Sequence, residues 1–260
     1  MTLASLSRRG LAGLALAGAL AAALPAPAQT SGEPVLIGVS GPLTGPQAQY
    51  GELWKQGFDL ALARINAEGG INGRPLEYVF EDSQNDPRQS IAIAQKFISD
   101  PKIVVEVGDF SSTASMAASP LYQRGGLVQF GFTNSHPDFT RTGDYMWSTS
   151  ISQIQEQQVM ADYAIDRLGL KKIAIMHLNT DWGTTAKNLF VEQAKARGVE
   201  IVATEGYLPD EKDFRATLTR IKAANPDGIL LESYYSDGAL VTRQIRELGI
   251  DLPAEQATAA

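Results

Sequence analysis

The chain has 260 residues, with 22 Lys or Arg against 29 Asp or Glu, so its formal net charge at pH 7 is −7. This acidic balance, with no basic cluster beyond the first ten residues, argues against a nucleic-acid-binding protein. Cysteine is absent and only His136 and His177 are histidines, which excludes a disulfide framework, a thiolate or histidine-rich metal site and a cysteine nucleophile. We therefore expect neither a metal nor another cofactor.

Residues 1–28 have the pattern of a signal peptide. Arg8 and Arg9 provide a positive start, residues 10–24 are uncharged and rich in Leu and Ala, and Ala26-Pro27-Ala28 is a small-x-small cleavage site. The apolar run is shorter than the roughly 20 residues of a membrane span, although an N-terminal anchor is the alternative interpretation. The arginine pair leaves both Sec and twin-arginine export open. We expect cleavage after Ala28 and a periplasmic location.

The next part of the chain, up to about residue 131, alternates short apolar strands with amphipathic helices. Strands are predicted at residues 35–39, 76–80, 103–105 and 127–130. The first helix ends at Gly69-Gly70, and Asp86 caps a second that has Pro87 at its first position. Ser111-Ser112-Thr113 begins a third helix, which runs to about Gln123.

The same alternation restarts after a polar, turn-rich stretch at residues 134–150. Helices are predicted at residues 153–168, 183–197 and 236–248 and after Asp213, and strands at 171–177, 199–204 and 228–231. Repeated strand–helix–strand units predict parallel sheets with right-handed crossovers. We expect two doubly wound α/β lobes, residues 29–147 and 148–260, joined by a hinge near residues 146–150.

The order of several segments resembles the Leu/Ile/Val-binding family of periplasmic proteins, the type I solute-binding components of ABC importers. The matching segments are Gly41-Pro42-Leu43-Thr44-Gly45, Tyr50-Gly51, residues 65–73, Asp82, Asp86-Pro87, Gly108 with Ser111-Ser112-Thr113, Asp181-Trp182-Gly183, Asp213-Phe214 and Tyr234-Tyr235. The similarity as a whole runs from about residue 34 to residue 252. The resemblance implies the type I periplasmic-binding-protein fold. Members of the family continue well beyond the position of Ala260, so it also implies C-terminal truncation, with both lobes incomplete.

Ligands of open parallel sheets bind beyond the carboxyl ends of the strands, where loops lead into helices. Phe110-Ser111-Ser112-Thr113 places hydroxyl groups and backbone N–H groups at a helix start, which suits a ligand carboxylate. A plain serine N-cap is the alternative. Asn134 and Ser135 follow another strand and can serve a ligand ammonium group or simply form a turn.

Four aromatic residues are expected at the same cleft: Tyr50, Trp182, Tyr234 and Tyr235. Their rings can cover an apolar ligand group or a cation, and packing in the core is the alternative for each of them. Glu232, at the end of a strand, is either a partner for a cationic ligand group or a solvated loop carboxylate.

No nucleophile elbow is present and neither histidine lies in a triad motif, so we do not expect an enzyme. The resemblance implies a monomeric periplasmic protein that captures an amino acid or similar small carboxylate by hinge closure. Its partners would be ABC permease subunits with their ATPases. A sensory domain of the same fold, reporting to a receptor or kinase, is the alternative. The sequence does not identify the ligand's side chain.

Overall fold

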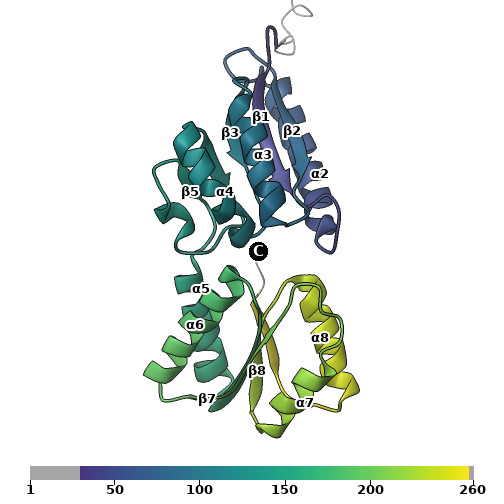
Figure 1. Cartoon of the computed structure of the whole chain (residues 1–260), viewed down its shortest axis with the longest axis vertical. Helices are drawn as coiled ribbons and strands as arrows, with labels where there is room; N and C mark the ends of the chain where they lie inside the picture. Colours follow the sequence, from purple (N-terminus) through teal and green to yellow (C-terminus); the bar gives the residue numbers. More distant parts are fainter. Residues whose placement is uncertain (1–29, 258–260) are drawn as a thin grey trace, which may run out of the picture.

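The structure is a computed structural model that describes residues 30–257, and within them it has two parallel β-sheets in two lobes (Figure 1). The strand order is β2-β1-β3-β4-β5 in lobe 1 and β7-β6-β8-β9 in lobe 2. The lobes lie end to end along the long axis, and the chain passes between them at residues 149–152 (Figure 1). The predicted signal peptide lies outside the described residues.

Lobe 1 alternates strands and helices as predicted, and adds one short strand. Its elements are β1 (Val35–Gly41), α2 (Ala48–Ala67), β2 (Leu76–Asp82), α3 (Pro87–Ser99), β3 (Ile103–Val107), α4 (Ser112–Gly125), β4 (Val128–Gly131), the 3₁₀ turn η1 (Phe139–Arg141) and β5 (Met146–Ser148). Asp86 caps α3 as predicted, because its carboxylate accepts the Arg88 backbone N–H at 2.7 Å. The sequence did not predict β5, whose three residues are too few to show a period.

Helices cover lobe 1 on two sides. Phe97 of α3 and Tyr122 of α4 are buried in one cluster on one face of the sheet. Helix α2 lies on the other face, where the ring of Trp54 is 4.5 Å from that of Phe132. Gly51 lets α2 approach the preceding loop, since a Cβ there would lie 2.1 Å from the Pro42 carbonyl oxygen. This contact fixes the start of α2 at the end of the lobe that faces lobe 2.

Lobe 2 has the same plan. Its elements are α5 (Gln153–Ala161), the π-helical turn η2 (Asp162–Arg167), β6 (Lys172–Leu178), α6 (Asp181–Ala196), β7 (Glu200–Tyr207), α7 (Arg215–Ala223), β8 (Gly228–Glu232), α8 (Tyr235–Glu247) and β9 (Ala254–Ala257). Helices α5 and α6 cover one face of the sheet and α7 and α8 the other. The predicted architecture, two doubly wound parallel lobes, is confirmed.

The starts of α6 and α7 differ from the prediction. Helix α6 begins at Asp181 rather than Gly183, because the Thr180 hydroxyl caps it by accepting the Gly183 N–H at 3.2 Å. Asp213 is not the N-cap of α7, which is Phe214, although its carboxylate still accepts the Arg215 N–H at 3.2 Å. No helix within residues 30–257 is long and apolar enough to span a bilayer.

Candidate functional site

The loops at the carboxyl ends of both sheets meet between the lobes. Trp182, at the start of α6, makes two of the contacts. Its backbone N–H donates to Thr113 Oγ1 at 3.3 Å, and its indole N–H donates to Ser135 Oγ at 3.0 Å. His136 Nε2 and Thr185 Oγ1 are 2.9 Å apart. Loops that are far apart in the sequence therefore form one interlobe surface, as the strand-end rule predicts.

The predicted aromatic residues come together at this surface. The ring of Phe110 lies 4.2 Å from that of Tyr50 and 5.0 Å from that of Tyr234. Trp182 stacks on Tyr234 at 5.6 Å, and Tyr235 meets Tyr50 edge-on at 5.0 Å. Phe110 comes from lobe 1 but is completely buried among side chains of lobe 2. Phe110, Trp182 and Tyr234 are therefore buried in one cluster that joins the two lobes, and the partly buried Tyr50 packs against it.

The three hydroxyl residues at the start of α4 have different surroundings. Ser111 is the N-cap, and its Oγ accepts the Ala114 N–H at 3.1 Å. Ser112 is buried, and its Oγ accepts the His136 N–H at 3.2 Å. Ser111 and Thr113 border a cavity of about 320 Å³. We call this the smaller cavity.

Tyr234 also borders the smaller cavity and links it to lobe 2. Burial raises the pKa of Tyr234 to about 12, and hydrogen bonds with Ser111 and Asn85 act in the opposite direction. The phenol is therefore a neutral group at the start of α4.

Asn134 is buried beneath the surface instead of facing a cavity. Its amide nitrogen donates to the Asp109 carbonyl oxygen at 3.2 Å and to Ser115 Oγ at 2.8 Å. Its amide oxygen has no hydrogen-bond partner among the described residues. Asn134 thus ties the loop after β4 to the loop that precedes α4.

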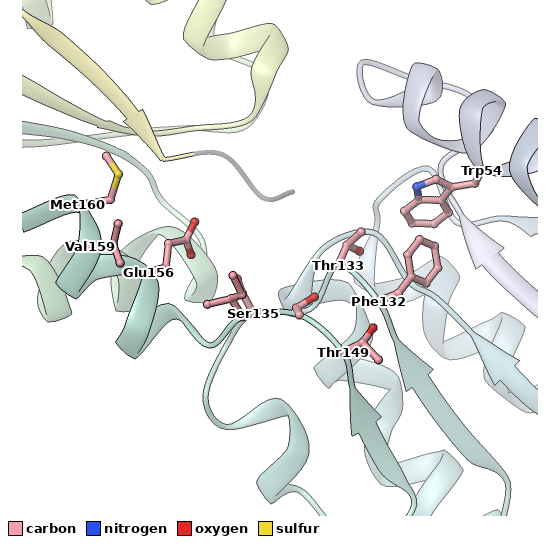
Figure 2. Close-up of a pocket in the computed structure, with 10 residues that line it drawn as sticks. Trp54, Phe132, Thr133, Ser135, Thr149, Glu156, Val159 and Met160 are labelled. Atoms are coloured by element: carbon pink, nitrogen blue, oxygen red, sulfur yellow. The ribbon is translucent and has the colours of Figure 1, made fainter. Parts of the chain in front are cut away.

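A larger cavity, of about 600 Å³, lies between lobe 1 and helix α5. Figure 2 shows Trp54, Phe132 and Thr133 of lobe 1 on one side of it and Glu156, Val159 and Met160 of α5 on the other. The remaining lining residues are Ser135, Thr149, Ser150 and Ile151. We call this the larger cavity. Of the residues predicted for the site, only Ser135 lines it.

Sequence reasoning missed Trp54, Phe132 and Glu156 as residues of this site. Trp54 fits the apolar face of α2, and Phe132 follows a strand end whose next residues, Asn134 and Ser135, carry the more obvious chemistry. Nothing in the spacing distinguishes Glu156 from the other polar residues of α5. Their common feature is position, because each lies where one lobe faces the other.

Two acidic side chains of lobe 2 lie at or behind the larger cavity. Burial raises the pKa of Glu156 to about 7. Glu232, at the end of β8, has no exposed surface, and neither carboxylate oxygen has a hydrogen-bond partner among the described residues. Burial, and secondly the charge of Glu156, raise the pKa of Glu232 well above its usual value. The interpretation of Glu232 as a solvated loop carboxylate is therefore wrong.

Comparison with known proteins agrees with this geometry. The family model described as "Periplasmic binding protein" matches residues 34–259. The chain belongs to this family. An "Amino acid binding protein" of Pseudomonas aeruginosa is 31% identical over 94% of this chain and 64% of its own length. "Leu/Ile/Val-binding protein homolog 2" of Brucella abortus is 31% identical over 88% of this chain and 62% of its own length.

A solved structure shows the same fold. The branched-chain amino acid transporter substrate-binding protein LivJ of Streptococcus pneumoniae, in complex with isoleucine, matches with a TM-score of 0.80 and 27% identity. The match covers 86% of this chain and 64% of that protein. The predicted family and type I periplasmic-binding-protein fold are thus confirmed. The chain spans less than two thirds of the length of each of these three relatives.

Proposed function

We propose that the protein is a periplasmic solute-binding protein that captures an amino acid or similar small carboxylate between its lobes and delivers it to ABC permease subunits. One observation carries the proposal: each lobe supplies different chemistry to the same surface. Lobe 1 provides hydroxyl groups and a helix start, and lobe 2 provides Trp182 and Tyr234. Family membership supports the same conclusion. The protein performs no bond chemistry in this role.

The carboxylate subsite is expected at the start of α4. Backbone N–H groups in the first turn of a helix have no intrahelical acceptor, and the helix dipole makes this end positive. The Ser111 hydroxyl is occupied in capping, but it borders the smaller cavity together with Thr113. A carboxylate there would accept charge-assisted hydrogen bonds from these groups.

Capture would use the connection between the lobes as a hinge. Within the described residues the chain crosses between lobes at 149–152, next to the hinge predicted near residues 146–150. The start of α4 already contacts Trp182 in this structure, so opening about this segment would separate them and closure would restore the contact. We retain the division into lobes at residues 147 and 148 as part of this proposal.

Calorimetry on the purified chain tests the proposal. L-Leucine, L-isoleucine, L-phenylalanine and their methyl esters are the probes, and at least one free acid is expected to bind more tightly than its ester. Thr113→Val should weaken that acid about tenfold, because one charge-assisted hydrogen bond is worth about 1.5–3 kcal/mol. Ser99→Ala, at an exposed position in α3, is the matched control. Equal affinity for acid and ester would contradict the carboxylate subsite.

A periplasmic role also requires export, so we propose that the mature protein begins at Gln29. Peptide mass spectrometry of periplasmic extract should detect this N-terminus. A membrane-bound product that retains Met1 would contradict it.

A further inference from the structure

We propose that the smaller cavity binds a carboxamide group of the ligand, and that Gln47 at the start of α2 is the residue that selects for this group. The inference rests on the proposed function and narrows its ligand class from small carboxylates to those whose side chain ends in a carboxamide.

Gln47 is a buried polar residue whose side chain has no structural partner. Its exposed fraction is 6%, and it borders the smaller cavity. It is the N-cap residue of α2, but its side chain does not cap the helix. Its backbone carbonyl accepts the Tyr50 N–H at 3.0 Å, and its side-chain amide has no hydrogen-bond partner among the described residues. Burying an amide without a partner is unfavourable, and a ligand in the cavity would supply one.

Asn85 brings a second incompletely paired amide to the same cavity. It lies between β2 and α3 with a φ of 53–57° shared with Gln84, a left-handed conformation that asparagine tolerates. One hydrogen bond joins its side chain to Tyr234. Its Oδ1 atom is buried and has no partner in the described part of the chain, so it can accept an N–H of a ligand.

The rest of the cavity wall is polar, and none of the described residues that line it is a base. Hydroxyl groups come from Ser111, Thr113, Thr180 and Tyr234. The acids are Asp86, which is paired with Arg88, and Asp210, which is exposed. A ligand side chain that ends in a carboxylate would face these acids without a cationic partner.

A carboxamide supplies what the two protein amides lack. Its N–H groups can donate to Asn85 Oδ1, and its oxygen can accept from the amide nitrogen of Gln47. A carboxylate has no proton to donate to Asn85, and an ammonium group has no lone pair to accept from Gln47. A hydrocarbon side chain would leave both amides unpaired, and a site built to form hydrogen bonds discriminates strongly against an analogue that lacks them.

The position of the cavity agrees with a subsite for the ligand's side chain. Ser111 and Thr113, at the proposed carboxylate subsite, border the same cavity of about 320 Å³. This volume is at the small end of the usual range for small-molecule sites. A ligand whose carboxylate lies at the start of α4 therefore has its side chain close to Gln47 and Asn85.

Ligands of matched shape test the inference. L-Asparagine, L-leucine and L-aspartate have side chains of the same length and branching that end in a carboxamide, two methyl groups and a carboxylate. L-Glutamine, L-homoleucine and L-glutamate form the same series with one more methylene. Calorimetry on the purified chain at neutral pH should show, in at least one series, that the carboxamide binds about tenfold or more tightly than both of its counterparts.

Two variants assign this preference to Gln47. The preference is the ratio of the Kd for the hydrocarbon ligand to the Kd for the carboxamide ligand, measured within each variant, so a general loss of affinity does not change it. Gln47→Met keeps the length of the side chain and should lower the ratio about tenfold. Gln49→Met, at an exposed position in α2, is the matched control and should keep the wild-type ratio. Thermal unfolding shows whether both variants fold, and the wild-type ratio remains a test if Gln47→Met does not.

The outcomes separate the two proposals. If neither carboxamide binds more tightly than its counterparts, or if folded Gln47→Met keeps the wild-type ratio, selection by Gln47 is overturned while carboxylate capture stands. If the wild-type chain binds none of the six ligands, selection by Gln47 is also overturned, and the proposed function is then decided by L-isoleucine, L-phenylalanine and their esters.

Discussion

Each lobe buries more than one acid, and two of them, Asp109 of lobe 1 and Glu232 of lobe 2, are held in opposite ways. Asp109 of lobe 1 is almost completely buried, but three groups donate to it: Ser83 Oγ at 2.8 Å, Ser90 Oγ at 2.6 Å and the Phe110 backbone N–H at 2.5 Å. Glu232 of lobe 2 is equally buried, and neither of its oxygens has a partner among the described residues.

Asp109 accepts hydrogen bonds that connect several segments of lobe 1, whereas the oxygens of Glu232 accept none from the described residues. Asp109 joins α3 and the turn after β2 to the loop that precedes α4, and so positions Ser111 and Thr113. Buried carboxylates with several donors stabilise the groups around them, whereas an unsatisfied one costs stability. The groups that act on the Glu232 carboxyl are the charge of Glu156, which raises its pKa, and the Gln157 side chain, which opposes that rise.

The largest expected change in the free energy of unfolding comes from replacing Asp109, the acid that accepts three hydrogen bonds. Asp109→Ala leaves three buried donors without an acceptor, and we expect it to lower the free energy of unfolding by about 3–4 kcal/mol. Urea denaturation at pH 7 measures this loss. Asp109→Asn keeps the shape and one acceptor and should cost about half as much.

The comparison between the two lobes fails if Asp109→Ala costs less than Asp109→Asn. That order would mean that the three donors find other acceptors once the side chain is removed, so that their hydrogen bonds to Asp109 contribute little to stability.

Replacing Glu232 should change the free energy of unfolding by a smaller amount and in the opposite direction. The folded-state pKa of Glu232 lies above its unfolded value, so the protonated form stabilises the fold at low pH and this stabilisation is lost as pH rises. Glu232→Gln removes the charge and keeps the volume, so at pH 8 we expect it to raise the free energy of unfolding by about 1–2 kcal/mol.

The gain from Glu232→Gln should shrink as the pH is lowered, because burial raises the pKa of Glu232 and the wild-type carboxyl becomes neutral in the unfolded state as well. Comparing variant with wild type at each pH cancels the contributions of the other titrating groups, including His136 and His177. A variant that is less stable than wild type at pH 8 would show that Glu232 has a stabilising partner, and the contrast with Asp109 would disappear.

Much of the fold follows from the sequence because its signals are local. The Asp86 cap with Pro87 and the apolar strands predict elements within a few residues of their observed bounds. The loop before α4 and the aromatic residues follow from the rule that places ligands at strand ends. Strands β5 and β9, of three and four residues, are set by pairing with β4 and β8, and short segments show no period of their own.

The detail of the candidate site depends on packing that local patterns do not encode. Ser112 and Ser111 are neighbours with the same chemistry, yet one hydroxyl accepts an N–H from the loop after β4 and the other caps the helix at the edge of a cavity. The position of Glu156 at the larger cavity depends on how α5 sits against both lobes. The site residues predicted from the sequence therefore stay a proposal that the binding experiments must test.

The smallest expected change in the free energy of unfolding comes from removing one of the three hydrogen-bond donors to Asp109. Ser90→Ala removes one of its three donors and leaves Ser83 and the Phe110 N–H in place, so we expect a loss of about 1 kcal/mol in the free energy of unfolding. Burial raises the pKa of Asp109, and the Ser90 hydrogen bond opposes that rise by favouring the ionised form. Without the Ser90 hydroxyl the pKa of Asp109 should rise further, so the loss in the free energy of unfolding should be larger at pH 7 than at pH 4.

Urea denaturation measures this loss, with Ser99→Ala as the matched control. The exposed Ser99 hydroxyl donates to the Lys96 carbonyl oxygen at 2.8 Å. If the two variants are equally stable at both pH values, Asp109 does not depend on its donors, and the contrast between Asp109 and Glu232 disappears.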